Sequence, residues 1–186
     1  MKIYIITDLE GASGVFKFAQ TRGVMGTQEG IAAVRLLMGD IAAVVKGLRD
    51  GGASEVYVLD GHGSGNNFLP EEMLADGARY ITGKPRPPLA GLDESFAGLV
   101  QLGMHAMNGT PDGILHHTQS SGNESKYWYD GIERGEIYQG AVHAGHYNIP
   151  VIMVTGDEAA CREAKELLGE DLPTAAVKKG LSREAA

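Results

Sequence analysis

Acidic and imidazole side chains follow the ends of three apolar runs in the sequence. They are Asp8 and Glu10 after residues 2–7, His62 after residues 55–60, and His105 after residues 99–103. In an open sheet of parallel strands, the carboxyl ends of the strands face a common crevice in which ligands bind. Carboxylates and imidazoles are side chains that bind zinc and similar divalent metal ions. The pattern therefore predicts one metal site built from distant parts of the chain.

Asp8 and Glu10 lie two positions apart, so an extended backbone would point both side chains to the same side. Two carboxylates this close repel each other and raise each other's pKa unless a cation lies between them. Asp8 could bridge two metal ions, with Glu10 as a terminal ligand of one of them. The alternatives are a carboxylate that caps the loop and an acid that binds a ribose at a nucleotide site.

His62 lies in the segment Gly61-His62-Gly63-Ser64-Gly65, whose glycines let the backbone approach a bound group closely. Asp60 is expected to contact the imidazole and fix the orientation of the ring. Alone, His62 or His105 would be interpreted as an ordinary loop histidine. Their shared position after an apolar run, the same as that of Asp8, favours the metal site.

Other candidate residues follow in the second half of the chain. His116 and His117 are adjacent, and adjacent side chains of an extended segment point in opposite directions, so we expect one of them at the site. That residue would be a metal ligand or a general acid or base, and the other would be structural. Glu136 opens a predicted helix and could add a carboxylate, although a glutamate there also suits the helix dipole. His143 and His146 share a helix face and are interpreted as packing or surface residues.

The composition limits the partners and the compartment. The chain has 186 residues, within the range of one domain, and its 27 glycines lack a collagen period and indicate tight loops. A formal net charge of −8 argues against nucleic acid or an anionic membrane surface as a partner. Cys161 is the only cysteine, which excludes a cysteine-rich zinc site and indicates a buried thiol. Without a signal-peptide shape or an apolar run near the roughly 18 residues of a membrane span, we expect a cytoplasmic protein.

The spacing of apolar residues predicts alternating strands and helices. Residues 27–50 carry apolar side chains at spacings of three and four, which predicts an amphipathic helix that Gly51-Gly52 ends. Strands are predicted at residues 2–7, 55–60, 78–82, 99–103, 126–130, 151–155 and 174–177, further helices at 136–147 and 157–168, and a loop at 11–26. The strand–helix–strand order at the start implies parallel strands. We therefore expect an α/β fold, a single three-layer domain over residues 1–186 with a mostly parallel central sheet flanked by helices.

Two other functional classes lack their signatures. No Gly-x-Ser-x-Gly elbow of a serine hydrolase occurs, and no Walker loop or Gly-x-Gly-x-x-Gly motif joins a strand to a helix. The sequence therefore does not support nucleotide binding.

An ordered set of short motifs resembles one known family. The set comprises Asp8-Leu9-Glu10-Gly11, Asp60-Gly61-His62 with Asn66-Asn67, Leu102-Gly103-Met104-His105-Ala106, His117 and Gly135-Glu136. It also includes Gly91-Leu92-Asp93, Pro150-Val151-Ile152-Met153-Val154, Gly156-Asp157 and Thr174-Ala175-Ala176-Val177-Lys178. Together these motifs resemble the zinc-dependent D-aminopeptidases of bacterial dipeptide-transport operons, and they span nearly the whole chain.

The resemblance implies a site with two zinc ions per subunit. The ligands that it implies are Asp8, Glu10, His62, His105 and Glu136, and the residue that it implies in catalysis is His117 rather than His116. The family removes N-terminal D-amino acids, typically D-alanine, from short peptides and amides. It forms large homo-oligomeric rings, which implies a decameric ring here.

Two departures from the family pattern affect these expectations. Family chains continue well beyond the point where this sequence stops, so a substrate wall or an assembly surface of the family is expected to be missing. Small insertions also separate His105 from His117 and His117 from Glu136. The alternatives to the D-aminopeptidase are a non-catalytic metal-binding or ring-assembly protein and a different metal-dependent amidase that acts on cell-wall peptides.

Overall fold

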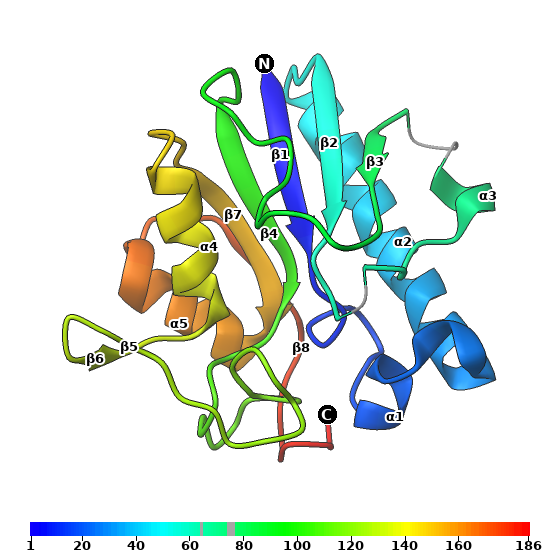
Figure 1. Ribbon diagram of the computed structural model, residues 1–186, viewed down its shortest axis with the longest axis vertical. Helices are drawn as coiled ribbons and strands as arrows, with labels where there is room; N and C mark the ends of the chain where they lie inside the picture. Colours follow the sequence, from blue (N-terminus) through cyan, green and yellow to red (C-terminus); the bar gives the residue numbers. More distant parts are fainter. Residues whose placement is uncertain (64, 74–76) are drawn as a thin grey trace.

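A parallel sheet forms the centre of the computed structural model, which describes residues 1–63, 65–73 and 77–186. Within these residues the sheet has six strands, in the spatial order β3-β2-β1-β4-β7-β8, and every neighbouring pair is parallel. The strands are β1 (Lys2–Thr7), β2 (Glu55–Asp60), β3 (Arg79–Ile81), β4 (Gly98–Met104), β7 (Val151–Asp157) and β8 (Thr174–Lys178). The predicted α/β class with a mostly parallel central sheet is therefore confirmed (Figure 1).

The middle of the sheet is buried on both faces. All seven residues of β4 are buried, as expected for a strand whose sequence is an almost continuous apolar run. β1 lies between β2 and β4, with Thr7 opposite Asp60 on one side and opposite Leu102 on the other. The chain runs outward from β1 in both directions, so β1 and β4 flank the switch point at which such folds bind ligands.

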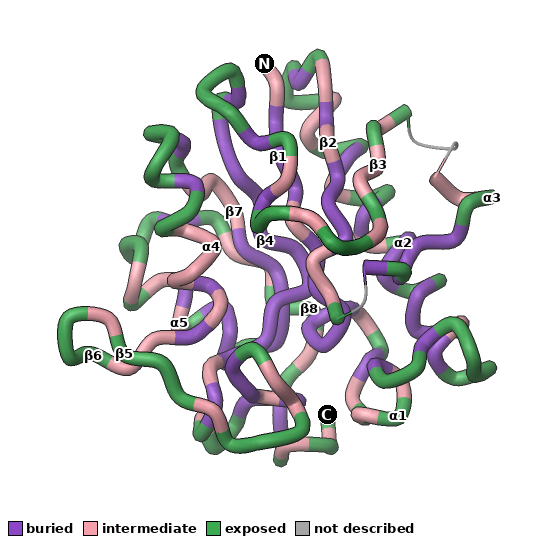
Figure 2. The backbone as a smooth tube through the Cα atoms, in the orientation of Figure 1, coloured by how far each residue is buried: buried purple, intermediate pink, exposed green. Residues whose placement is uncertain are grey.

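Helices cover both faces of the sheet. α2 (Gln28–Asp50) packs on one face, where its buried apolar side chains meet those of β1, β2 and β4. α4 (Glu136–Gly145) and α5 (Glu158–Leu168) lie on the other face, around Val154 and Met104 (Figure 1). The three-layer arrangement is thus as predicted. Figure 2 shows the buried residues concentrated in the central strands of the sheet.

Capping side chains determine where α2 and α5 begin. Thr27 Oγ1 accepts a hydrogen bond from Gly30 N at 3.0 Å, which satisfies a free donor at the start of α2. Asp157 Oδ1 accepts from Ala160 N at 2.7 Å and starts α5, as predicted. Its other oxygen accepts from Ile114 N at 2.6 Å, so the same cap also holds the chain just before the two adjacent histidines.

Several local elements differ from the predictions. Residues 11–26, predicted as a loop, contain two short helices, α1 (Phe18–Thr21) and η1 (Val24–Gly26). The prediction failed because no amphipathic period fits in so few residues; a side chain, Gln20 Oε1, accepts from Phe16 N and Lys17 N instead. The short helix α3 (Pro70–Met73) was also not predicted.

The strand predicted at residues 126–130 is one arm of a hairpin. β5 (Trp128–Tyr129) pairs antiparallel with β6 (Ile132–Glu133). Asp130 and Gly131, both with positive φ, form the turn, which is the Asp-Gly signal of a tight hairpin. The hairpin projects from the body of the molecule (Figure 1).

The single cysteine and the character of the helices can be compared with the expectations from the sequence. Cys161 is buried, as predicted. Within the described residues, none of the helices combines the length and the apolar character that crossing a membrane would require. Ser64, part of the glycine segment around His62, lies outside the described residues.

Candidate metal centre

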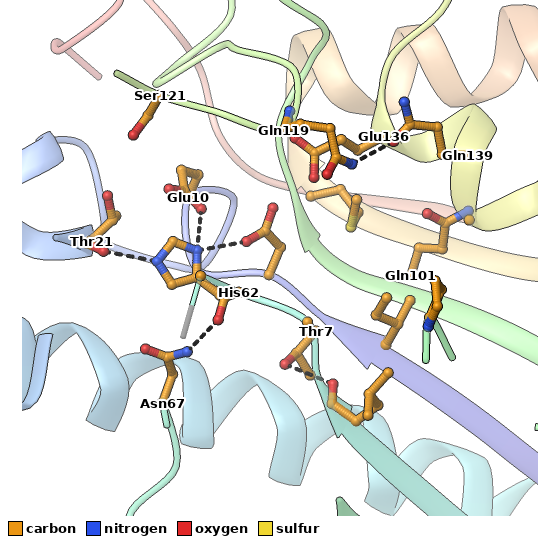
Figure 3. A pocket seen from close by; sticks show the side chains of 18 of the residues that line it. Thr7, Glu10, Thr21, His62, Asn67, Gln101, Gln119, Ser121, Glu136 and Gln139 are labelled. Atoms are coloured by element: carbon orange, nitrogen blue, oxygen red, sulfur yellow. Dashed lines mark hydrogen bonds and ion pairs between the residues drawn. The ribbon is translucent and has the colours of Figure 1, made fainter. Parts of the chain in front are cut away.

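The side chains predicted at the strand ends meet at one edge of the sheet. Asp8 and Glu10 follow β1, His62 follows β2, and His105 follows β4. Glu136 reaches the same point from the first turn of α4. Figure 3 shows His62 between Glu10 and Thr21, with Glu136 above the end of the sheet. The parallel topology, not closeness in sequence, brings these residues together.

Asp8 contacts two histidines with its two carboxylate oxygens. Oδ1 lies 2.9 Å from His62 Nδ1, and Oδ2 lies 3.3 Å from His105 Nε2. Although burial alone raises the pKa of Asp8, the imidazoles of His105 and His62 hold it well below its usual value. Asp8 is therefore a carboxylate at neutral pH, and each oxygen is directed to a different side of the site.

Glu10 and His62 complete one side of the site. His62 Nδ1 lies 3.0 Å from Glu10 Oε2, while Nε2 lies 2.8 Å from the carbonyl of Thr21. Because a carbonyl can only accept, Nε2 carries a proton, and Nδ1 is left facing two carboxylate oxygens. Although burial alone lowers the pKa of His62, Glu10 and Asp8 raise it well above its usual value. In the metal-free protein, a proton on Nδ1 thus occupies the place between the carboxylates that a cation would take.

His105 and Glu136 form the other side. His105 Nδ1 donates to the carbonyl of Ala106 at 2.9 Å, which leaves Nε2 directed to the site. Nε2 lies 3.4 Å from Glu136 Oε1, and it is buried without a hydrogen-bond partner among the described residues. Burial lowers the pKa of His105, but Asp8 and Glu136 raise it well above its usual value. Gln119 N donates to Glu136 Oε1 at 2.7 Å and fixes that carboxylate.

His117 lies beside the His105 and Glu136 side. Its ring stacks on that of His105, with centroids 4.0 Å apart, and its Nε2 is 3.9 Å from Glu136 Oε1. Its Nδ1 donates to the carbonyl of Leu115 at 2.8 Å, so Nε2 is the free acceptor. Leu115 and Gln119 bracket the histidine with φ of 53° and 67°, a strained conformation that is common at functional sites.

His116 does not line the cavity above the site, as expected for one of two adjacent residues. Its Nδ1 accepts from Gly109 N at 3.0 Å, and burial with the nearby Arg183 lowers its pKa. The side chains of His143 and His146 are exposed, as predicted for surface residues. His143, however, also lines the cavity above the site.

The donor set fits a zinc centre. Zinc ligands lie about 2.0–2.1 Å from the ion in a tetrahedron, which puts ligand atoms about 3.3 Å from one another. Here the contacts between carboxylate oxygens and imidazole nitrogens span 2.9 to 3.4 Å. Asp8, Glu10 and His105 form one group whose ligand atoms lie within 4.8 Å of one another, and His105, His117 and Glu136 form a second. His105 Nε2 and Glu10 Oε2 are buried and form no hydrogen bond within the described part of the chain, so a cation would satisfy both atoms.

Asp60 does not contact the imidazole of His62, contrary to the prediction. Its two oxygens accept from the backbone and side-chain nitrogens of Asn67, at 2.6 and 2.9 Å. Asn67 Nδ2 also donates to the carbonyl of His62 at 2.8 Å, so Asp60 holds the His62 loop through Asn67. The two nitrogens of His62 are instead occupied by the Asp8 and Glu10 carboxylates and by Thr21, whose loop was not predicted to lie here.

Lys178 holds the loop that carries Glu10, a role that the sequence pattern did not predict. At the end of β8, its Nζ donates to the carbonyls of Glu10 at 2.6 Å, Ala12 at 2.8 Å and Val15. Burial lowers its pKa to about 8. The three acceptors lie more than 160 positions away in sequence, so no local pattern could have shown this contact.

Two glycines allow the ligand segments to touch. Gly11 N donates to Gly103 O at 2.7 Å, and a Cβ on Gly11 would lie 1.9 Å from Met104 O. Gly103 has a φ of +73°, and a Cβ there would lie 2.3 Å from Asp8 O. The close approach of the two backbones sets the distance between Asp8 and His105.

A cavity of about 1200 Å³ opens over the site. Its lining includes the acidic residues Asp8, Glu10 and Glu136 together with His62 and His117. The volume exceeds that of a typical small-molecule site and can accommodate a short peptide beside the candidate metal ligands.

Comparison with known proteins gives a consistent result. A family model described as D-aminopeptidase (Peptidase_M55) matches residues 1–186. A D-aminopeptidase of Bacillus subtilis (strain 168) is 36% identical over 188 residues, which cover 100% of this chain and 66% of that protein. The solved structure of the Zn-dependent D-aminopeptidase DppA from Bacillus subtilis, a self-compartmentalizing protease, matches with a TM-score of 0.87 and 34% identity, again over 100% of this chain and 66% of that one.

The chain thus spans just under two thirds of the length of each of these relatives. The resemblance that the motifs indicated is confirmed, and the same fold is found in a protein described as zinc-dependent. Because the family match covers every residue of the sequence, this chain belongs to the D-aminopeptidase family.

Proposed function

We propose that the protein is a metal-dependent aminopeptidase that removes N-terminal D-amino acids, of the D-alanine type, from short peptides or amides through two zinc ions. The observation that carries the proposal is the pair of Asp8 contacts, in which one carboxylate oxygen faces His62 and the other faces His105. A carboxylate arranged in this way can bridge two ions. Glu10 and His62 would complete one ion's ligands, and His105 and Glu136 those of the other.

The chemistry of such a centre suits amide hydrolysis. Two zinc ions bound there would polarise the scissile carbonyl and lower the pKa of an attacking water. The protein supplies the fixed geometry: Thr21 O orients His62, Ala106 O orients His105, and Gln119 N orients Glu136. Such supporting contacts fix the tautomer and direction of each ligand.

His117 is the proposed proton carrier. His117 lines the cavity beside Glu136, and its free Nε2 can take a proton from the attacking water and pass it to the leaving amine. While it holds that proton, the ring can also stabilise the developing negative charge on the carbonyl oxygen. The contact of Nδ1–H with Leu115 O keeps the tautomer that this role requires.

One assay tests the proposal. Protein that has been loaded with zinc should release D-alanine from D-alanine amide and should act much more slowly on the L-amide. Elemental analysis of the same sample should give two zinc ions per chain, and one per chain for His62→Ala. A zinc-loaded protein that cleaves neither amide would contradict the proposed activity, whereas cleavage with one ion would contradict only the two-ion site.

We also propose that the chain assembles with copies of itself into a ring, for which the family resemblance implies ten subunits. The relative DppA is described as self-compartmentalizing. In this chain the hairpin β5–β6 exposes Trp128 by 58% and Ile132 by 52%, which suits a contact with another copy. Sedimentation velocity of the protein and of a Trp128→Ser variant tests this, and a monomer at micromolar concentration would contradict it.

A further inference from the structure

The cavity over the site also contains basic side chains. Among the described residues that line it, Arg22, Lys84 and Arg86 carry positive charge, while Asp8, Glu10 and Glu136 carry negative charge. None of these three basic residues forms an ion pair with a described carboxylate, although the chain has a net charge of −8. Positive charge that no carboxylate neutralises attracts an anionic ligand into a cavity.

Arg22 is committed to a structural contact. Its guanidinium donates to Ser121 O at 2.7 Å and to Ser121 Oγ at 3.3 Å, and it stacks on the ring of Phe18. It therefore connects two loops at the mouth of the cavity. Two of its five N–H donors and one face of the guanidinium are used in these contacts.

Lys84 and Arg86 have donors to spare. Lys84 Nζ donates to Gly63 O, and Arg86 Nη2 donates to Asp60 O. An ammonium has three donors and a guanidinium five, so most remain free. Arg86 Nε is buried and has no acceptor among the described residues. The nearby Asp60 carboxylate is occupied by Asn67 and forms no ion pair with Arg86.

Both side chains are anchored close to the candidate metal ligands. Their acceptors are the carbonyls of residues 60 and 63, which lie on either side of His62. Consecutive Cα atoms are 3.8 Å apart, so these anchors lie within about 8 Å of the His62 backbone. A peptide residue spans at most about 3.3–3.6 Å, so a peptide of two or three residues can connect the two regions.

We propose that Lys84 and Arg86 bind the C-terminal carboxylate of the peptide, so that the cavity selects short zwitterionic peptides. The inference rests on the proposed aminopeptidase function, which requires the N-terminal residue at the metal site. The two ends of a short peptide then match the two charge regions of the cavity. Arg86 can hold a carboxylate with two parallel hydrogen bonds, and Lys84 adds a second charge.

A matched set of substrates tests the inference. D-alanyl-D-alanine has the carboxylate, D-alanyl-D-alanine amide lacks only that charge, and D-alanine amide reports the chemical step alone. We expect the unmodified, zinc-loaded protein to have a lower KM for the acid than for its amide. Lys84→Gln and Arg86→Gln should each raise the KM for the acid by roughly 10- to 100-fold, the range for losing a hydrogen bond to a charged group.

The same variants should change the hydrolysis of D-alanine amide far less than that of the dipeptide acid. Lys17→Gln is the control, because Lys17 is an exposed cation that does not line the cavity. Equal losses on all substrates would show that Lys84 and Arg86 only hold the His62 segment, and would overturn the inference. So would an unmodified protein without preference for the acid, or a preference that disappears in Arg22→Gln instead.

Calorimetry separates this inference from the proposed activity. If the zinc-loaded protein cleaves none of the substrates, the aminopeptidase proposal fails, but the peptide and its amide can still be compared as ligands. Tighter binding of the acid, lost in Lys84→Gln, would support the subsite without turnover. Equal binding of acid and amide would reject it.

Discussion

The imidazole rings of His105 and His117 stack with a centroid distance of 4.0 Å and an interplanar angle of 16°. The two rings have different surroundings at their Nε2 atoms. His105 Nε2 points between two carboxylates, whereas His117 Nε2 lies 3.9 Å from the nearer oxygen of Glu136 and lines the cavity. Stacking therefore holds the His117 ring beside the candidate ligand His105, while the Nε2 atom of His117 stays outside the centre of the site.

His117→Ala should retain zinc and lose most of its turnover. The substitution removes the proposed proton carrier but leaves Asp8, Glu10, His62, His105 and Glu136 in place. General acid–base assistance speeds a reaction by about 10²–10⁴-fold, so kcat for D-alanine amide should decrease by a factor in that range. Zinc content from elemental analysis and kcat are measured on the same preparation.

His116→Ala is the control for that variant. His116 does not line the cavity, and its Nδ1 accepts from Gly109 N, so its loss should lower stability slightly and leave kcat within a few-fold. If His117→Ala kept full turnover with bound zinc, His117 would have no part in the reaction.

Zinc binding should release protons at neutral pH. In the metal-free protein the pKa values of His62 and His105 are raised well above the usual value, so both rings hold an extra proton at pH 7. A metal ligand must offer its lone pair, so these protons leave when zinc binds. Apparent zinc affinity should therefore rise with pH until the raised pKa values are passed. Asp8, whose pKa is lowered, is already ionised and contributes no proton.

Calorimetry in two buffers with different ionisation enthalpies counts the released protons. The unmodified protein should release more than one proton per chain at pH 7 when the site is filled. In His62→Ala this number should fall by about one, because that ring no longer titrates. Zinc binding without proton release at pH 7 would contradict the arrangement of His62 between the Asp8 and Glu10 carboxylates.

The sequence was sufficient to predict the layers of the fold and the edge of the sheet at which the candidate ligands meet. The apolar runs of β1, β2 and β4 are fully or largely buried strands, and their ends carry Asp8, His62 and His105 as the parallel topology requires. The amphipathic period of α2 and the Asp157 cap of α5 were also sufficient to predict these two helices. These features depend on local periodicity and on the general rule for strand ends.

Contacts between distant segments could not be predicted. The partner of His62 Nε2 is a backbone carbonyl, Thr21 O, on a short helix that has no periodic signal. Asp60 was expected at the imidazole, but Asn67, which lies further along the same loop, donates to its carboxylate from both the backbone and the side chain. Residue types alone do not specify which of several neighbouring donors a buried carboxylate will accept.

Lys178→Met should weaken zinc binding by roughly 10-fold or more, the usual effect of removing a contact behind a metal ligand. Methionine keeps much of the buried stem but removes the ammonium that holds the carbonyls of Glu10, Ala12 and Val15. The loop that carries Glu10 should then move more freely. Competition with a zinc-binding dye measures the affinity.

Lys179→Met provides a comparison next to it in sequence. Lys179 is an exposed residue that pairs with Glu158 at 3.2 Å and does not touch the Glu10 loop. Its replacement should leave zinc affinity unchanged. Equal affinities in both variants would show that Lys178 does not position Glu10.

Gly11→Ala should disrupt the site even though it adds only a methyl group. The new Cβ would lie 1.9 Å from Met104 O and 2.4 Å from Gly103 C, and both atoms belong to backbone that cannot rotate away. The strand ends must separate, which moves Asp8 and Glu10 from His105 and costs about 1–3 kcal/mol of stability.

Gly39→Ala, in an exposed turn of α2 with no atom within 4 Å of the new Cβ, should instead stabilise the protein by about 0.5–1 kcal/mol. Chemical denaturation and zinc titration of both variants test the pair. Full zinc affinity in Gly11→Ala would show that the spacing of the two backbones does not set the geometry of the centre.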